Sequence, residues 1–552
     1  MNILSEIKEP STFIEGLWGR IPRELKYLFL FALAVGLATH LFVFMQKLPN
    51  HDDLNEFTLL VEHNLSMGRW FRNVIWHLGG EFSIPWTRGL LALLFLSASC
   101  CFTVAVLQIN RPLWMGLCAA LMITWPVVSS MFTFMFMAEA FQFALLAACC
   151  SAWLARRGGW RRLVCGIFIL CLGLATYQAS FFYAASLLLI ALIFDIISGC
   201  TEEEIRAKAA SALALLSGAF ALYLISILVL KWFFQVNLLS YQGVSSLAGT
   251  EFLKNLCFNS LNSAALIYRS FAADLFTEPL GDGFFGRYLR LFAALFCVAA
   301  LMMAAWNREL WKSPLRLLSA LVLLLASPLC FSGIYFIGFI NPQKAYIFMH
   351  VVMTYGGVFL WVLAVKAAAF LAAGKWQKPA AAGCSRLLLW CCLFSLGALA
   401  YGNYLFTNET YLKMYLGYEK TYAFSAELTR RIGEELHDGR KLPLAFIGDI
   451  SKVIDEGDLK QKKFRMMTAA FDGAELVRCN QYHRFLKNYL GCGSVSRLCS
   501  KWEEEELAKL PEVKAMPVFP ADGSVKVVRK YIVIKLPAGT DVTQENKAEA
   551  EE

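Results

Sequence analysis

Two adjoining segments decide the fold, the apolar run YLFLFALAVGLATHLFVFM (residues 27–45) and the polar turn QKLPNHDDLNE (residues 46–56). A helix needs about 20 mostly apolar residues to cross a bilayer, so the first segment predicts a membrane-spanning helix. The turn then places His51, Asp52 and Asp53 where this helix leaves the bilayer. Adjacent carboxylates repel each other, which points to a site. The alternative is an ordinary polar loop that caps a helix, because structural ion-pair networks use the same residues.

The composition is that of a polytopic membrane protein. The 552 residues are 58% hydrophobic and only 17% charged, and their mean hydropathy is +0.53. A soluble protein of this size could not bury so much apolar surface. The first apolar run lacks a small-residue cleavage pattern, so we expect it to remain as an anchor.

We expect a mainly α protein with about eleven membrane spans, since further apolar runs of the required length follow the first. The pair 163–177 and 180–197 is tightly spaced and is compatible with a re-entrant hairpin. The predicted spans are 27–45, 84–107, 113–131, 138–154, 163–177, 180–197, 210–232, 289–306, 316–338, 346–366 and 386–404.

Basic residues orient these spans. With the N-terminus inside, the loops rich in Arg and Lys, such as 156–162 and the loop around Lys366, all fall on the inner side, as the positive-inside rule requires. The outer side then receives residues 46–83, residues 235–288 and the C-terminal tail. Residues 1–26 are basic and amphipathic, and they predict an interfacial helix on the inner surface.

The outer segments predict further structure. Residues 56–78 and 251–276 carry apolar residues at helical spacing, which predicts helices on the membrane surface. From residue 405 the composition is that of a soluble α/β domain extending to about residue 537. Its expected elements are helices at 422–437, 481–490 and 501–510, a strand at 444–448, and paired strands at 525–528 and 531–536. Residues 538–552 are rich in Glu and predict a disordered tail.

The cysteines do not form a metal motif. Most of the 17 lie in apolar runs, where they act as small hydrophobic residues, and their spacing does not match a zinc site. Cys257, Cys479, Cys492 and Cys499 lie in segments expected outside, where an oxidising compartment would permit a disulfide. The sequence leaves the pairing open.

Three acids are the candidates for chemistry. Neighbouring side chains at a helix exit diverge, so one of Asp52 and Asp53 can face a substrate while the other accepts from a backbone amide or holds a cation. A carboxylate placed there suits general-base work on a sugar hydroxyl. Glu139, at the outer mouth of the fourth predicted span, is the second acid, because an ionisable residue at a span end is a functional candidate. Its alternative role is to cap the helix N-terminus.

Cations on the outer side oppose the positive-inside bias and invite another explanation. Arg69, Arg72 and Lys344 suit an anionic lipid headgroup, because guanidinium and ammonium groups bind phosphate oxygens. The alternative for each is a solvated or snorkelling cation. Further substrate-binding candidates are His51, Tyr177, Gln178 and Tyr346, although a Tyr/Gln pair at an interface is also typical of the aromatic belt.

The sequence contains no P-loop, dinucleotide fingerprint, HExxH or GxSxG motif. Nucleotide-driven transport and serine or zinc hydrolysis therefore lose support. No nucleic-acid partner is expected, whereas membrane lipids are.

Five short motifs lie near the two ends of the chain: LPNHDDL (48–54), GRW (68–70), IPW (84–86), MPVFPADGSVKVV (516–528) and YIVIKL (531–536). These motifs resemble those of the serotype-converting O-antigen glucosyltransferases, polytopic inner-membrane enzymes with a GT-C type architecture. The resemblance extends from residue 27 to about residue 537.

This resemblance implies a GT-C-like domain at 27–404 and a periplasmic α/β domain at 405–537 in a bacterial inner membrane. It implies transfer of glucose from a polyprenyl-phosphate donor to O-antigen on the periplasmic face. In GT-C enzymes an acid of the first outer loop activates the acceptor, and Asp52 matches that position. The family often has an Asp where Glu139 stands, which leaves the role of Glu139 open. The C-terminal domain either binds the acceptor glycan or packs on the outer loops.

The expected reaction is a single inverting displacement. A lipid phosphate leaves readily, so a base on the acceptor and cations on the phosphate suffice. A divalent cation, Mg or Mn, held by Asp52, Asp53 and Glu139 is an option that the sequence leaves open. The alternatives are a flippase or transporter of lipid-linked glycans, an O-antigen polymerase, or a GT-C transferase acting on another glycan or lipid. The spans are nearly free of charge at mid-membrane and show no internal repeat, which argues against a transporter.

Overall fold

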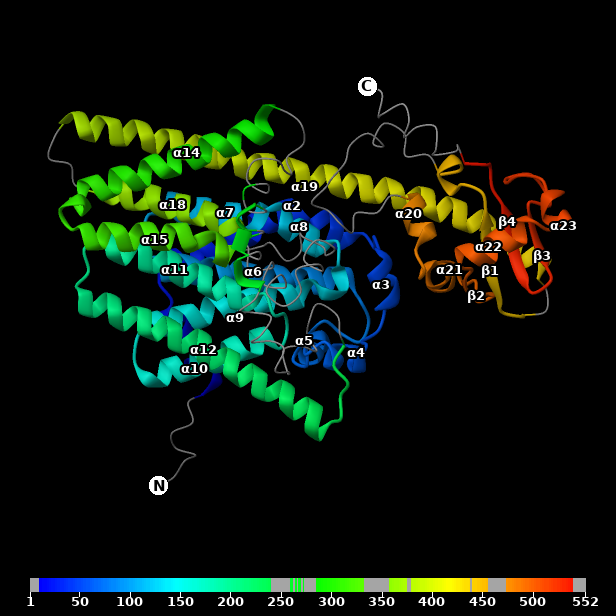
Figure 1. Ribbon diagram of the computed structural model, residues 1–552, viewed down its shortest axis with the longest axis horizontal. Coiled ribbons are helices and arrows are strands. Elements are labelled where there is room, and N and C mark those ends of the chain that lie inside the picture. The colour runs from blue at the N-terminus through cyan, green and yellow to red at the C-terminus, as the bar shows by residue number, and fades with distance from the viewer. Residues whose placement is uncertain are drawn as a thin grey trace. The chain divides into compact units, whose positions relative to one another are not determined.

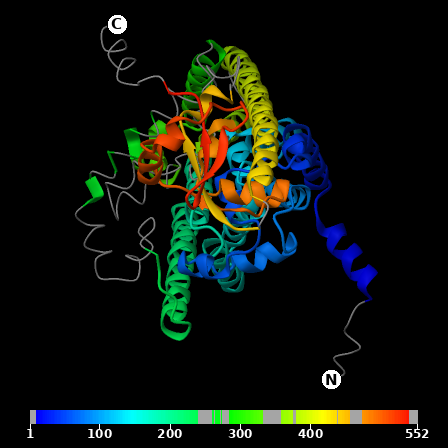
Figure 2. The same cartoon turned by 90° about the vertical axis from the view of Figure 1, so that its right-hand side faces the viewer.

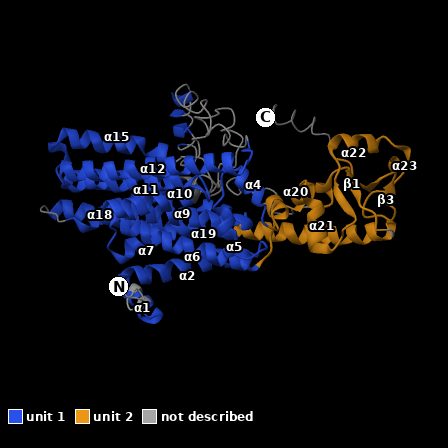
Figure 3. Ribbon diagram, turned by 90° about the horizontal axis from the view of Figure 1, so that it is seen from below, with its two compact units in different colours: residues 1–45, 59–408, 465–467 blue, residues 46–58, 409–464, 468–552 orange. Residues whose placement is uncertain are grey.

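A computed structural model describes residues 9–239, 259–261, 264–265, 267–269, 272, 284–331, 357–374, 379–436, 439–454 and 473–539. The chain divides into two compact units, shown in different colours in Figure 3. Unit 1 comprises Met1–Met45, Leu59–Asn408 and Arg465–Met467. Unit 2 comprises Gln46–Thr58, Glu409–Phe464 and Thr468–Glu552. The turn with Asp52 and Asp53 therefore belongs to the same unit as the C-terminal part of the chain.

Unit 1 is helical, and its long helices lie side by side (Figure 1). Helix α6 packs against α9 and α2, and α10 packs against α9 and α12. The first helices of unit 1 are α1 (Pro10–Arg20), α2 (Arg23–Met45), α4 (Val61–Ser66) and α5 (Arg72–Leu78). The others are α6 (Pro85–Leu107), α7 (Pro112–Thr124), α8 (Pro126–Phe132), α9 (Ala138–Arg156), α10 (Trp160–Leu174), α11 (Ser180–Ser198), α12 (Glu202–Phe233), α14 (Phe284–Asn307), α15 (Pro314–Phe331) and α18 (Val358–Ala373), with 3-10 turns η2 (Met135–Met137) and η4 (Leu310–Lys312).

The sequence sets the helix ends locally. Proline is the first residue of α6, α7 and α8, a position where its missing N–H costs nothing. Pro126 also separates α7 from α8, which meet at 46°, because proline disfavours a helical conformation in the residue before it. Helix α12 begins with a capping box between Thr201 and Glu204, and α11 ends at Gly199 in the left-handed conformation.

Within the described residues, eight helices are long and apolar enough to span a membrane, or nine if the bent pair α7–α8 counts as one span. The predicted first, second and fourth spans coincide with the candidate spans α2, α6 and α9. Helices α10 and α18 are shorter than these spans, with 15 and 16 residues. Large parts of the predicted span 346–366 and of the outer loop 235–288 lie outside the described residues.

Helix α1 confirms the predicted N-terminal helix and stands apart from the rest of unit 1 (Figure 2). It exposes Ile14 and Trp18, and the Lys26 ammonium lies 4.7 Å from the Trp18 ring centroid. Exposed apolar residues beside cations are typical of a helix at a lipid–water interface.

Helix α19 (Pro379–Glu435) corrects one prediction. It is continuous over 57 residues, whereas the sequence predicted a span ending at 404 and a separate helix from 422. Residues 405–421 lack proline and are rich in Leu, Tyr, Lys and Glu, so the helix continues through the point where the composition changes.

Unit 2 contains a four-stranded sheet in the order β2-β1-β4-β3, whose strands lie side by side in Figure 2. Strands β3 (Val525–Val528) and β4 (Tyr531–Lys535) pair with each other, as predicted, and they run antiparallel. Strand β1 (Leu442–Ile447) pairs in parallel with β4 and with β2 (Val495–Leu498). Strand β2 was not predicted from the sequence. The remaining elements are α3 (His51–Asn55), η7 (Ile450–Lys452), α20 (Gly473–Arg478), α21 (Tyr482–Leu490), α22 (Lys501–Ala508) and α23 (Pro511–Lys514).

The core of unit 2 contains Leu54 together with Leu428, Tyr482 and Phe485. The C-terminal part of the chain thus packs on the segment that follows the first span, one of the two roles expected for it. Cys479, Cys492 and Cys499 are free thiols in the structure.

Candidate functional site

The turn after α2 is held by a capping box. Asn50 caps α3, and its Oδ1 accepts from the backbone N–H groups of Asp52 (2.7 Å) and Asp53 (3.0 Å). The Asp53 carboxylate accepts in return from the Asn50 backbone N–H at 3.2 Å. Side chains that satisfy the first N–H groups of a helix fix its start. Asp53 thus accepts from a backbone amide, which is one of the two roles expected for one of these acids.

Asp52 is the more accessible acid. Its side chain is 36% exposed, and its Oδ1 lies 3.4 Å from the His51 Nε2. Asp53 is buried, at 7% exposure. A general base must reach the proton that it removes, so Asp52 is the better placed of the two within this turn.

The C-terminal part of unit 2 supports the turn. Leu54 is in the hydrophobic core, and the Arg484 guanidinium donates to the Asn55 carbonyl at 2.8 Å. The Lys47 ammonium lies 4.0 Å from the Phe57 ring centroid and 4.9 Å from that of Tyr489. These contacts fix α3 at both ends, which is the pre-organisation that a catalytic carboxylate needs.

Electrostatics link the acids to their surroundings. Burial lowers the pKa of Lys47, and the nearby Asp53 carboxylate partly opposes this. Burial also raises the pKa of the Cys479 thiol to about 12, with a smaller contribution from Asp52. The pKa of Tyr489 is raised by burial and by Asp53. Cys479 and Tyr489 therefore stay neutral near pH 7 and do not compete with Asp52 for the role of base.

In unit 1 the structure brings together three residues that the sequence proposed separately. The Arg69 Nε donates to the Gln178 Oε1 at 3.2 Å, and its guanidinium lies 5.2 Å from the Tyr177 ring centroid. Gln178 in turn donates to the Met67 carbonyl (2.9 Å) and to the Tyr223 hydroxyl (3.1 Å). Arg69 and Gln178 are half-buried, so this cluster presents a positioned cation.

We expect Gly68→Ala to destabilise the protein by more than about 1 kcal/mol, because Gly68 has a left-handed φ of +71° and its Cβ would lie 2.7 Å from the Ile227 Cδ1 and the Tyr223 Oη. Thermal unfolding of the purified protein in detergent measures this. Gly402→Ala is the matched control, since a Cβ there meets nothing within 4 Å. Equal melting temperatures for both variants would contradict the expected clash of a Cβ at position 68 with Ile227 and Tyr223.

Glu139 is fully enclosed in unit 1. It is 1% exposed, and its Oε1 forms an ion pair with Arg88, which is 0% exposed. Arg88 also donates to the Phe82 carbonyl at 3.0 Å and lies 3.6 Å from the Trp76 ring centroid. The Glu139 Oε2 has no hydrogen-bond partner in the part of the chain that is described.

Arg72 lies close enough to Glu139 to act on it electrostatically. It is 2% exposed, donates to the Asn64 Oδ1 and lies 5.2 Å from the Phe136 ring centroid. A guanidinium enclosed in this way is less accessible to a phosphate than the half-buried Arg69.

Sequence reasoning missed Arg88, Tyr223 and Arg484. Arg88 could have been proposed from the sequence, because it follows the IPW motif and lies close to the segment 46–83 that was expected outside, like Arg69 and Arg72. Tyr223 lies in a long apolar run and Arg484 in the C-terminal region, and neither carried a local signal.

The candidates Lys344 and Tyr346 lie outside the described residues. Among the residues that are described, no group of three or more His, Cys, Asp or Glu is arranged to hold a metal ion. Asp52 and Asp53 belong to unit 2 and Glu139 to unit 1, so a metal shared by these acids stays a prediction.

Comparison with known proteins gives one family. Residues 41–361, more than half of the chain, match the family model described as Glucosyl transferase GtrII. The matched segment contains the capped turn, the Arg69 cluster and the Arg88–Glu139 pair. Curated proteins and solved structures gave no match. The protein belongs to the GtrII glucosyl transferase family, the serotype-converting O-antigen glucosyltransferases that its motifs resemble.

Proposed function

We propose that the protein transfers glucose from a polyprenyl-phosphate donor to O-antigen repeat units on the periplasmic face of the bacterial inner membrane. The family supports a glucosyl transferase of O-antigen modification. The observation that carries the mechanism is the Asp52 side chain, 36% exposed on a turn that follows the first span and is fixed by a capping box.

The proposed reaction is one displacement at the anomeric carbon. The Asp52 carboxylate takes the proton of the acceptor hydroxyl, and the acceptor oxygen forms a bond to the anomeric carbon. The bond from that carbon to the phosphate oxygen breaks, and its electron pair leaves with the polyprenyl phosphate. Attack opposite the leaving group inverts the anomeric configuration. No strong general acid is required, because the phosphate leaves as a stable anion.

Arg69 is the proposed phosphate-binding cation of the described residues. Its guanidinium is held by Gln178 and by the Tyr177 ring, so little side-chain freedom is lost on binding. Lys344 is a second proposed cation. Arg72 and the Arg88–Glu139 pair are proposed as positioning residues, because the structure encloses all three side chains.

The donor class is tested with purified protein, an O-antigen repeat unit as acceptor, and either polyprenyl-phosphate glucose or UDP-glucose. We expect transfer from the lipid-linked donor alone, with the opposite anomeric configuration in the product when it is measured by NMR. Direct transfer from UDP-glucose would contradict the proposed donor. Retained configuration would contradict the single displacement.

Arg69→Gln should lower kcat/KM for the lipid-linked donor by about 10- to 100-fold, since a hydrogen bond to a charged group contributes about 1.5–3 kcal/mol. Steady-state kinetics with varied donor measure this, and Arg69→Lys should recover part of the loss. The control is Arg161→Gln, which removes an exposed cation. Equal losses of kcat/KM in Arg69→Gln and Arg161→Gln would contradict the proposed role of Arg69 in binding the donor phosphate.

A further inference from the structure

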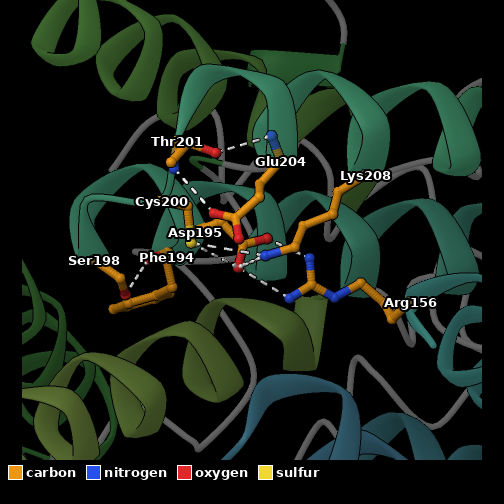
Figure 4. A network of polar contacts seen from close by, with 8 residues as sticks. All are labelled: Arg156, Phe194, Asp195, Ser198, Cys200, Thr201, Glu204 and Lys208. Atoms are coloured by element: carbon orange, nitrogen blue, oxygen red, sulfur yellow. Dashed lines mark hydrogen bonds and ion pairs between the residues drawn. The ribbon is translucent and has the colours of Figure 1, made fainter. Parts of the chain in front are cut away.

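A charged cluster lies at the opposite ends of the helices from the Arg69 cluster, on the side where the basic loops gather. Asp195 near the end of α11 pairs with Arg156 at the end of α9, and the Arg156 Nη2 lies 3.1 Å from the Asp195 Oδ1. The Lys208 Nζ of α12 lies 3.0 Å from the same oxygen. Figure 4 shows both cations pointing at the Asp195 carboxylate. The three side chains join three helices at one partly buried point.

A third cation, Lys366, is not paired with a carboxylate of the described residues. Lys366 of α18 is 9% exposed and lies within electrostatic range of both Asp195 and Arg156. In the described part of the chain its ammonium forms neither a hydrogen bond nor an ion pair, and it lies 5.3 Å from the Phe194 ring centroid and 5.9 Å from that of Phe370. A buried charge without a counter-charge is costly.

The positive excess extends around the cluster. The Arg308 guanidinium lies 5.3 Å from the Phe370 ring centroid, and the Arg316 Nη1 lies 3.8 Å from the position that a Cβ would take on Gly199. Glu204, drawn in Figure 4, accepts from the Thr201 backbone N–H at 3.0 Å. Its side chain is exposed, so solvent screens its charge from these cations. The described side chains thus place Asp195 against a surplus of cations.

The surroundings indicate which kind of anion would balance these cations. Trp306 and Trp311 flank Arg308 in the chain and are 67% and 46% exposed, and their ring centroids are 4.6 Å apart. Exposed tryptophans mark the level of the lipid headgroups. Basic pockets between helices on the cytoplasmic side are suited to anionic lipid headgroups.

We propose that the headgroup phosphate of an anionic phospholipid binds at this cluster and provides the counter-charge for Lys366. The acyl chains lie along the apolar helix surfaces, and the phosphate approaches Lys366 and Arg308 beside the Phe194–Phe370 pair. The site is separate from the proposed donor site, and the lipid acts there as a structural ligand.

The test uses the purified full-length protein in a mild detergent after delipidation. Phosphatidylglycerol, phosphatidylcholine and inorganic phosphate are titrated separately while the melting temperature is followed. We expect phosphatidylglycerol to raise the melting temperature of the wild type, and phosphatidylcholine and phosphate to leave it unchanged. An equal rise in melting temperature with inorganic phosphate would show that the ligand need not be a lipid. An equal rise with phosphatidylcholine would show that the negative charge of the lipid is not required. Either result would overturn the proposal.

Lys366→Gln should weaken the apparent affinity for phosphatidylglycerol by about fivefold, since one Lys near an anionic lipid contributes about 1 kcal/mol. Lys366→Arg should keep it. Arg206→Gln is the matched control, because it removes one exposed cation from the same end of α12, where Arg206 pairs with Glu202. Equal affinities of wild type and Lys366→Gln would overturn the proposal. If Lys366→Gln fails to fold, native mass spectrometry of the wild type takes its place. Equal retention of phosphatidylcholine and phosphatidylglycerol by the wild type would overturn the proposal.

Discussion

Replacing Asp52 with asparagine is expected to lower the rate of glucose transfer by about 10²–10⁴-fold, the usual contribution of a general base. The amide has nearly the same shape as the carboxylate but cannot take the proton of the acceptor hydroxyl. The Asp52 side chain is 36% exposed, and it is the Asp52 backbone N–H, which the substitution keeps, that takes part in the capping box. We therefore expect Asp52→Asn to fold normally. Initial rates at saturating donor and acceptor, together with a melting curve, measure both quantities.

Asp53→Ala is the matched comparison, and we expect the opposite pattern. It leaves the Asn50 backbone N–H without its carboxylate partner, in a turn where Asn50 is fully buried. An unsatisfied buried donor costs about 1–3 kcal/mol. The total rate of glucose transfer by Asp53→Ala should thus fall only in proportion to the loss of folded protein. An active Asp52→Asn beside a folded but inactive Asp53→Ala would instead identify Asp53 as the base.

Breaking the Arg88–Glu139 pair is expected to destabilise unit 1 by about 3–5 kcal/mol, because either single substitution leaves a buried charge without its partner. Arg88 is 0% exposed and Glu139 1%, so solvent cannot replace the lost partner. Glu139→Leu and Arg88→Met are the single variants, and unfolding in detergent measures the free-energy change of each.

The double variant Arg88→Met/Glu139→Leu separates a positioning role from a catalytic one. It removes both charges, so its destabilisation should be smaller than the sum of the single variants by about 0.5–3 kcal/mol. We assign a positioning role to the pair. The rate of glucose transfer by the double variant should therefore fall only in proportion to the loss of folded protein. A double variant that folds and transfers no glucose would restore Glu139 as a catalytic acid.

The membrane-spanning part of the fold was largely predictable, because the length of an apolar run determines whether a helix can cross a bilayer. Helices α2, α6 and α9 lie within a few residues of their predicted bounds. The continuity of α19 was not predictable from hydropathy, since residues 405–421 change from apolar to polar while their helix propensity persists. Strand β2 was missed because Val495–Leu498 alternates too briefly to be recognised alone.

The candidate site was predictable where its signal was local. Asp52 and Asp53 stand out because they directly follow the first apolar run, and one of them was expected to accept from a backbone amide or to hold a cation. The capping box between Asn50 and Asp53 was seen only in the structure. Contacts between distant segments did not follow. Arg88 and Glu139 are 51 positions apart, and Arg484 and Asn55 are 429 apart. Such pairs depend on how the helices pack, which no spacing rule encodes.

Glucose transfer from a polyprenyl-phosphate donor to O-antigen is tested by mass spectrometry of lipopolysaccharide from a strain that expresses this protein. The strain is compared with and without the enzymes that make polyprenyl-phosphate glucose, at equal membrane abundance of the protein. We expect one added hexose per O-antigen repeat unit when the donor is made, and none when it is absent. An unmodified O-antigen in the presence of donor, or a hexose added without it, would contradict the proposed transfer.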